Sequence, residues 1–136
     1  MSDETTTALR IVDANLNRLR EALRVIEEYH RFGGGGDEAV ALKAMRHSLQ
    51  SIEERIGRQR MLAGRDTATD PFSSEVRPEE EQRRGLADVA TASLKRAQEA
   101  ARVLEEYTKV LADPAAAQQA KKVRFGLYDL EKRLAQ

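Results

Sequence analysis

The sequence predicts an all-α protein, a pseudo-two-fold four-helix bundle made of two duplicated helical hairpins joined by an irregular loop. An internal repeat is the main reason: REALRVIEEY at residues 20–29 returns as QEAARVLEEY at 98–107, an offset of 99 − 21 = 78 positions. The offset holds without a gap between residues 8–57 and 86–135. Because a repeat unit fixes the architecture of the whole chain, we expect each copy to form one helical hairpin.

Four segments carry the apolar spacing of an amphipathic helix. Apolar residues recur in each at alternating intervals of four and three, which places them on one helix face. The four stripes are Val12, Leu16, Leu19, Leu23 and Ile26; Leu42, Met45, Leu49, Ile52 and Ile56; Ala90, Leu94, Ala97, Ala101 and Leu104; and Ala120, Val123, Leu127, Leu130 and Leu134. Alanines replace larger residues in the third stripe, so this helix should approach its neighbours closely.

Helix-ending and helix-starting residues agree with this division. The glycines at 33–36 are expected to end the first helix and form a turn, with Asp37 as the cap of the second helix. Asp113 precedes Pro114, the arrangement of a capping acid before a proline in the first helical turn. Residues 64–78 have no helical period, and the prolines within them exclude a continuous helix. No segment is a candidate strand.

Length and composition fit one domain over residues 1–136, with repeat 1 at about 8–57, a connector at 58–85 and repeat 2 at about 86–135. The formal net charge is zero and there is no basic block, which argues against nucleic-acid and membrane partners. The absence of cysteine excludes disulfides, thiol catalysis and thiolate metal sites. It also fits a reducing compartment. Because the first residues lack an apolar signal region, we expect a cytoplasmic protein.

Several charged positions recur in both copies, although a hydrophobic core requires no particular charge. Their spacing permits ion pairs along one helix, which is a purely structural explanation. However, Asn15 and Arg18 border the apolar stripe, where polar groups either build an internal network or line a cleft. Salt ladder and binding site therefore remain equal alternatives. The recurring charges are Glu21, Arg24, Glu27 and Glu28, matched by Glu99, Arg102, Glu105 and Glu106.

The irregular stretch GRDTATDPFSSE at 64–75 combines a cation, two carboxylates and hydroxyls. Such loops on a rigid scaffold often carry binding residues. Asp66 and Asp70 offer oxygen ligands suited to Mg²⁺, and Arg65 offers a guanidinium fork suited to phosphate. The alternative is a turn-rich linker without a binding role.

Two other motifs are better explained by structure than by chemistry. The glycine run is followed by Asp37 and Glu38, whose carboxylates would repel phosphate, so we expect a plain turn. Glu27 and His30 have the Glu-x-x-His spacing of di-iron bundles, but the second copy has Thr108 in place of the histidine. We therefore expect surface or packing residues rather than a transition-metal site.

Four motifs together resemble a known family. They are RIVDANLNRLREALRVIEEYHRF at 10–32, RDTATDP followed by PEEEQR across 65–83, SLKRAQEAARVLEEYTK at 93–109 and VRFGLYDLE at 123–131. On these motifs the chain resembles the helical segment that precedes the barrel in cyanobacterial-type thiamine-phosphate synthases and that also occurs alone. It departs from that family at Phe72-Ser73, where Gly-Thr is common, and at Ala92-Ser93, where Ala-Asn is common.

The resemblance implies a hydroxymethylpyrimidine-phosphate kinase. Such an enzyme passes a phosphoryl group from ATP to 4-amino-5-hydroxymethyl-2-methylpyrimidine phosphate, giving the diphosphate used in thiamine biosynthesis. Under this hypothesis Arg65, Asp66 and Asp70 face the reacting phosphates, and both aspartates bind Mg²⁺. The expected substrate and nucleotide ligands are Asn15, Arg18, Glu21 and Arg24 from repeat 1, and Lys95, Arg96, Glu99 and Arg102 from repeat 2.

The expected partners are ATP with Mg²⁺ and the small phosphate substrate, with a functional link to thiamine-phosphate synthase. Helical bundles of this size also often form homodimers. Two alternatives remain: a non-catalytic accessory or oligomerisation domain related to thiamine-phosphate synthase, and a helical mutase or lyase for a small dicarboxylate. The accessory hypothesis predicts that Arg65→Ala and Asp66→Ala leave the cellular function intact. Activity that survives chelation of Mg²⁺ would favour the mutase or lyase.

Overall fold

The computed structural model describes residues 2–135, except for the side chains of residues 79 and 80, and it contains helices and no strands over that range. The predicted all-α class is therefore confirmed. No helix in this range is long and apolar enough to cross a membrane. The helices are α1 (Asp3–Gly33), α2 (Gly36–Ile56), α3 (Arg58–Gly64), α4 (Pro78–Glu81), α5 (Leu86–Val110) and α6 (Pro114–Leu134).

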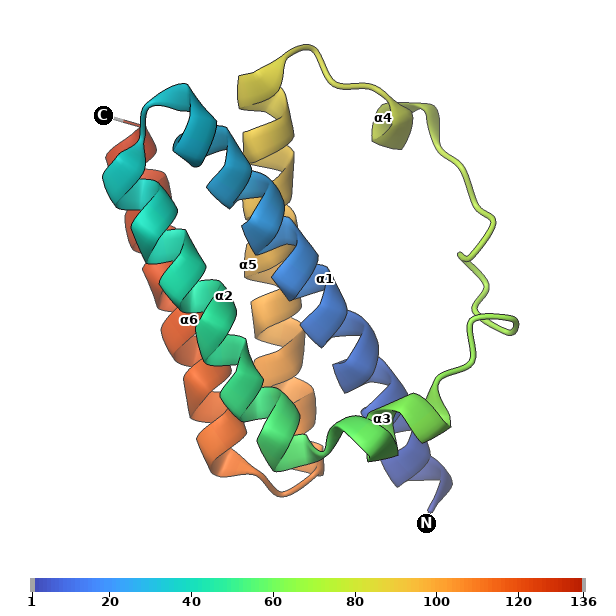
Figure 1. The fold of residues 1–136 in the computed structure, drawn as a ribbon. Helices are drawn as coiled ribbons and strands as arrows, with labels where there is room; N and C mark the ends of the chain where they lie inside the picture. Colours follow the sequence, from blue (N-terminus) through green and yellow to red (C-terminus); the bar gives the residue numbers. More distant parts are fainter. Residues whose placement is uncertain (1, 136) are drawn as a thin grey trace.

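The four long helices pack side by side, with α1 against α2 and α5, and α6 against α5 and α2 (Figure 1). The contact between α1 and α5 is the most extensive. The short helix α3 packs beneath the ends of α1 and α2, whereas α4 stands apart from the long helices on the extended connector (Figure 1). The connector therefore leaves much of the helical assembly uncovered.

The predicted apolar stripes form the core. The α1 stripe is almost completely buried, and Ala97 and Ala101 of α5 have no exposed surface. Because the distance between packed helices depends on the side chains at the contact, alanines at these positions allow α5 to lie close to α1. Two stripe positions differ from expectation: Met45 is half-buried, and Leu134 is 42% exposed at the last residue of α6.

The helix ends partly match the prediction. Gly34 follows α1 in the left-handed region at φ +95°, and the turn ends where α2 begins at Gly36. The prediction that Asp37 caps α2 is wrong, because the cap position is Gly35 and Asp37 lies inside the first turn. Its charge there complements the helix dipole instead. The predicted cap at Asp113 is confirmed, since its carboxylate accepts a hydrogen bond of 3.0 Å from the N–H of Ala116.

The connector is less irregular than predicted. Residues 58–64 form α3, which the sequence analysis assigned to an irregular segment. Tertiary packing explains this helix: Met61 is 3% exposed and belongs to the core. One buried residue gives no periodicity to detect in so short a segment. The predicted absence of a helix after Gly64 holds until Pro78, which starts α4.

One ion pair with a buried carboxylate joins α1 to α2, and another joins α5 to α6. Arg46 of α2 donates from Nε and Nη2 to the carboxylate of Glu27 on α1, at 2.9 and 3.4 Å. Arg124 of α6 donates in the same way to Glu105 of α5, at 2.7 and 3.2 Å. These arginine hydrogen bonds hold the pKa of Glu27 and the pKa of Glu105 below their ordinary values, although burial acts in the opposite direction.

We predict that Arg124→Ala destabilises the protein strongly. The substitution removes the arginine that is hydrogen-bonded to the carboxylate of Glu105, which is 6% exposed, and leaves it only the exposed Arg102 at 3.6 Å. Removal of one partner from a buried pair lowers the free energy of unfolding by about 3 kcal/mol or more. The control Arg102→Ala removes a cation whose side chain is 57% exposed. It should lower that free energy by less than about 1 kcal/mol. Urea denaturation measures the free energy of unfolding of both variants. Equal losses in the two would show that Arg124 does not stabilise the buried carboxylate of Glu105.

Stability should also fall at acidic pH. Because the folded-state pKa values of Glu27 and Glu105 lie below their ordinary value of 4.5, their contribution is complete above that value and is lost as pH falls through the folded pKa. The free energy of unfolding should therefore decrease between pH 5 and pH 3. The double variant Glu27→Gln and Glu105→Gln should show a smaller decrease over that interval. Parallel pH profiles for the two proteins would refute this explanation.

Candidate functional site

A groove of about 570 Å³ lies between α1 and α5. Each helix contributes five residues to its lining. Every position from α1 is matched by the position 78 residues later on α5, and only Asn15 and Ser93 differ between the two sets. The lining is Asn15, Arg18, Glu21, Ala22 and Val25 from α1, and Ser93, Arg96, Glu99, Ala100 and Val103 from α5.

Small residues on both helices make room for this groove. Ala22 and Ala100 are buried within its lining, at 7% and 3% exposure. A larger side chain at either position would occupy the space between the helices. The four charged lining residues, Arg18, Glu21, Arg96 and Glu99, are instead exposed. The groove therefore combines an apolar interior with two cations and two carboxylates.

The groove charges have almost no partners in the protein. Among residues 2–135, Glu21, Arg96 and Glu99 form neither a hydrogen bond nor an ion pair. Arg18 forms no ion pair in that range, and its one hydrogen bond, 3.5 Å from Nη1 to Oδ1 of Asn15, is long. Because nothing inside the described chain neutralises these groups, they are available to a charged ligand.

Three predicted binding residues lie outside the groove: Arg24, Lys95 and Arg102. The spacing that permits ion pairs along a helix explains Arg24 and Arg102, and Lys95 reaches across to α6. The salt-ladder alternative therefore describes Arg24 and Arg102, whereas it fails for Glu21 and Glu99, which form no ion pair within residues 2–135. The acidic partners are Glu28 at 3.0 Å for Arg24, Glu131 at 2.7 Å for Lys95 and Glu106 at 3.5 Å for Arg102.

A second cavity of about 550 Å³ adjoins the groove and shares Asn15 and Arg18 with it. It lies between α1 and the loop that follows α3. The three predicted catalytic residues, Arg65, Asp66 and Asp70, line this cavity together with Phe72. The fold thus brings the loop next to Arg18.

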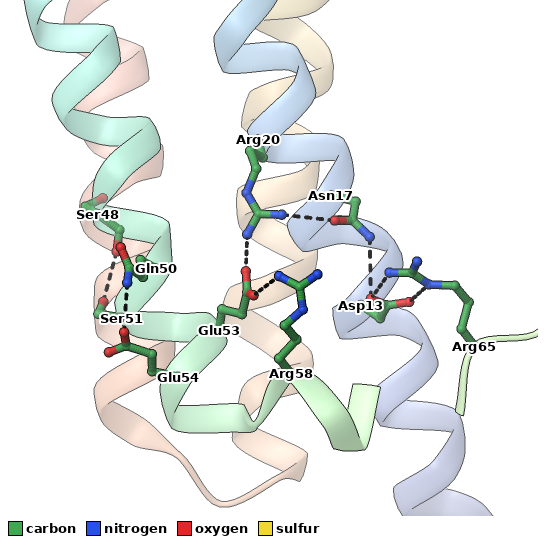
Figure 2. A network of polar contacts seen from close by, with 10 residues as sticks. All are labelled: Asp13, Asn17, Arg20, Ser48, Gln50, Ser51, Glu53, Glu54, Arg58 and Arg65. Atoms are coloured by element: carbon green, nitrogen blue, oxygen red, sulfur yellow. Dashed lines mark hydrogen bonds and ion pairs between the residues drawn. The ribbon is translucent and has the colours of Figure 1, made fainter. Parts of the chain in front are cut away.

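Arg65 is held in place by Asp13 (Figure 2). Its Nε and Nη2 donate to the two carboxylate oxygens of Asp13 at 2.8 and 2.7 Å. These hydrogen bonds raise the pKa of Arg65, so its charge is fixed. The carboxylate of Asp13 is buried on α1, whereas the side chain of Arg65 is 42% exposed. Because Nη1 donates no hydrogen bond within residues 2–135, it remains available to an anion.

The pair of Asp13 and Arg65 belongs to a longer polar network that joins the loop to three helices (Figure 2). Asn17 donates to Asp13 at 3.4 Å and accepts a hydrogen bond from Arg20 at 3.1 Å. Arg20 also forms an ion pair with Glu53 of α2, to which Arg58 of α3 donates at 3.4 Å. Contacting side chains therefore link the loop to α1, α2 and α3.

The loop aspartates hold the local backbone in turns. Asp66 accepts hydrogen bonds from the N–H and the hydroxyl of Thr69 at 3.2 and 2.8 Å, which hold the pKa of Asp66 below its ordinary value. Arg10 donates to the backbone oxygen of Asp66 at 3.1 Å. Asp70 accepts a hydrogen bond of 2.9 Å from the N–H of Phe72. The turn-rich alternative is therefore correct about the backbone, but the same loop also lines the cavity.

Only a limited metal role suits these aspartates. In the described part of the chain, no three acidic or histidine side chains gather in a way that could hold a metal ion. Mg²⁺ in enzymes is often held by one or two carboxylates together with the phosphates of the substrate. Binding of Mg²⁺ by Asp66 and Asp70 therefore stays a prediction.

The sequence analysis overlooked Asp13 as a site residue. Position 91, which matches Asp13 in the repeat, is a threonine, so Asp13 is not among the recurring charges. Its position beside the buried Val12 was the available signal, because a buried acid requires a partner. The departures from the resembled family also matter here, since Phe72 lines the second cavity and Ser93 lines the groove.

A family model and known proteins from two organisms match this chain over most of its length. The model of the ThiD2 family matches residues 10–133. The thiamine-phosphate synthase of Gloeobacter violaceus is 46% identical over 129 residues, which are 94% of this chain and 36% of that protein. The enzyme of the same name from Synechococcus sp. (strain CC9311) is 40% identical over 136 residues, 98% of this chain and 36% of that protein. The chain spans about a third of the length of these relatives. No solved structure matches it.

We predict that Asp13→Asn loosens the loop more than it destabilises the protein. The substitution removes the charge that holds Arg65. Because the side chain of Arg65 is 42% exposed, the cation left behind reaches water, and the loss of stability should be at most about 1 kcal/mol. Hydrogen exchange at the amides of residues 66–72 should become several-fold faster. The matched control Glu75→Gln removes the ion pair with Arg77 elsewhere on the connector and should leave residues 66–72 unchanged. Unaltered exchange at these amides in Asp13→Asn would show that Asp13 does not hold the loop.

Proposed function

Because the chain belongs to the ThiD2 family, we propose that it phosphorylates 4-amino-5-hydroxymethyl-2-methylpyrimidine phosphate with ATP in thiamine biosynthesis. One observation carries the proposal: Arg18 and Arg96 line one groove without ion-pair partners within residues 2–135. The loop that contains Arg65, Asp66 and Asp70 lines the adjoining cavity. Unpaired cations beside carboxylates are what a phosphate monoester and a magnesium nucleotide require.

The proposed transfer balances without a proton acceptor. An oxygen of the pyrimidine monophosphate dianion forms a bond to the γ-phosphorus of ATP. The bond between that phosphorus and the β,γ-bridging oxygen breaks, and its electron pair leaves with ADP. No proton is released, so the reaction requires no strong general base. The described groove accordingly needs no histidine, and neither His30 nor His47 lines it.

The residues of the two cavities have distinct roles in this proposal. Phosphoryl transfer depends on alignment of the reactants and on positive charge near the oxygens of the transferred group. Arg18, Arg96 and the free Nη1 of Arg65 supply that charge. Asp66 and Asp70 would hold the ion of the Mg·ATP substrate, and the chemistry that Mg²⁺ supplies there is neutralisation of phosphate charge. Asp13 acts through Arg65 and is a positioning residue.

We infer that the architecture arose by duplication of one helical hairpin, giving a single domain with pseudo-two-fold symmetry and four-helix-bundle topology. The equivalent ion pairs Glu27–Arg46 and Glu105–Arg124 support this inference. The matched lining of the groove supports it as well. In that arrangement α1 and α5 are equivalent elements, which explains why equivalent residues of both line one groove.

A non-catalytic accessory or oligomerisation role is the second candidate. It is favoured by the length of the relatives, since the chain spans about a third of the thiamine-phosphate synthases that it matches. Exposed aromatic residues on α6, Phe125 and Tyr128, would suit a protein contact. Under this alternative, Arg65→Ala and Asp66→Ala restore growth of a deletion strain as well as the unmodified chain does. Under the kinase proposal both variants fail to do so.

We predict that the purified chain forms ADP and the pyrimidine diphosphate from Mg·ATP and the pyrimidine monophosphate. The Arg96→Gln variant should lower kcat/KM about 100-fold, the size of the loss expected when one preorganised donor to a developing charge is removed. The matched control Arg102→Gln changes an arginine of the same helix that pairs with Glu106 outside the groove. It should retain activity within a factor of about 3.

Coupled detection of ADP measures kcat/KM for both variants, and ion-exchange chromatography separates the products. Circular dichroism establishes that each variant is folded. No turnover by the unmodified chain across a range of metals and pH values would reject the kinase proposal. Equal loss of activity in the two arginine variants would reject the groove as the site.

A further inference from the structure

We propose that the two halves of the groove take different ligands. The half formed by α1 takes the triphosphate of Mg·ATP, and the half formed by α5 takes the pyrimidine monophosphate. This inference rests on the proposed kinase function and adds the direction of transfer to it. The direction comes from a local asymmetry: one half adjoins the loop at residues 65–72, whereas the other does not.

The matched lining explains why one groove would take two related ligands. Arginine, glutamate, alanine and valine recur in the same order on α1 and α5. Each half therefore offers one guanidinium for a phosphate, one carboxylate for an N–H donor and an apolar surface for a flat ring. Adenine and the aminopyrimidine both carry an exocyclic amino group on a flat heterocycle, so both suit this set of residues.

The loop distinguishes the halves by charge. Arg18 lines both cavities, whereas Arg96 lines only the groove. The α1 half thus has Arg18 and Arg65 as cations, with Asp66 and Asp70 beside them. A triphosphate with a bound divalent cation requires several cations together with carboxylate oxygens. Of the two halves of the groove, the α1 half is the one that has this combination beside it.

The α5 half has the simpler requirement. A phosphate monoester needs one bidentate cation, and Arg96 has no competing partner in the described part of the chain. Glu99, one turn away on the same helix, is equally unpaired and can accept a hydrogen bond from the amino group of the pyrimidine. No loop carboxylate lines the groove at this half to repel the acceptor phosphate.

The junction of the two cavities then fixes where transfer occurs. Arg18 is the charged residue that both cavities share. The terminal phosphoryl group of the nucleotide and the acceptor phosphate would therefore meet at Arg18, which neutralises charge on both. The base of the nucleotide lies away from this point on the α1 side, and the pyrimidine ring lies along α5.

Binding measurements on matched variants test this direction. Isothermal titration calorimetry is done with two probes, the Mg²⁺ complex of a nonhydrolysable ATP analogue and the pyrimidine monophosphate. We expect Asp66→Asn combined with Asp70→Asn to weaken the nucleotide at least about 10-fold while the monophosphate changes less than about 2-fold. Glu99→Gln and Arg96→Gln should show the opposite pattern, and Glu21→Gln should weaken only the nucleotide.

Because Glu21 and Glu99 are exposed and unpaired, the two glutamine variants should unfold at the temperature of the unmodified chain. Reversed preferences, or equal effects of Glu21→Gln and Glu99→Gln on both probes, would overturn the assignment of halves. In that case turnover by the unmodified chain would leave the kinase proposal intact. Failure of the unmodified chain to bind either probe would overturn both.

Discussion

The close packing of α1 against α5 is the constraint on which the rest of the structure depends. Alanines at the contact, including Ala97 and Ala101, let the two helices approach. The same choice of small residues at Ala22 and Ala100 leaves space on the outer side of that contact. The core and the groove are thus two sides of one helix pair, and a change that separates the helices would alter both.

Repeated charges in this chain serve two different purposes. Glu27 and Glu105 are buried and joined to arginines of the neighbouring helix, so each ties one hairpin together. Glu21 and Glu99 are exposed at the groove and have no partner among the described residues. Recurrence of a charge 78 residues later does not distinguish the two purposes, whereas burial and pairing do. That difference underlies our proposal that the groove binds ligands.

The sequence predicted the helical class and the apolar stripes because periodicity is a local property of the chain. Arg18 and Arg96 stand 78 residues apart at matching positions of the sequence repeat and line one groove, whereas the place of the Arg65 loop does not follow from the repeat. The sequence did not reveal α3, whose helix depends on the burial of Met61. It also missed the hydrogen bonds between Asp13 and Arg65, because 52 residues separate them and only the fold decides which distant carboxylate an arginine reaches.

The phosphate site that we propose in the groove would differ from a glycine-rich phosphate loop. Such loops use backbone N–H groups, which point at a ligand only where the backbone leaves a helix or strand. The groove lies along the middle of α1 and α5, where backbone donors are already used within each helix. In the proposed site, side-chain cations would therefore supply the positive charge that the protein itself contributes. Arg96, which has no partner within residues 2–135, suits that role because an ion pair with the protein would compete with the ligand.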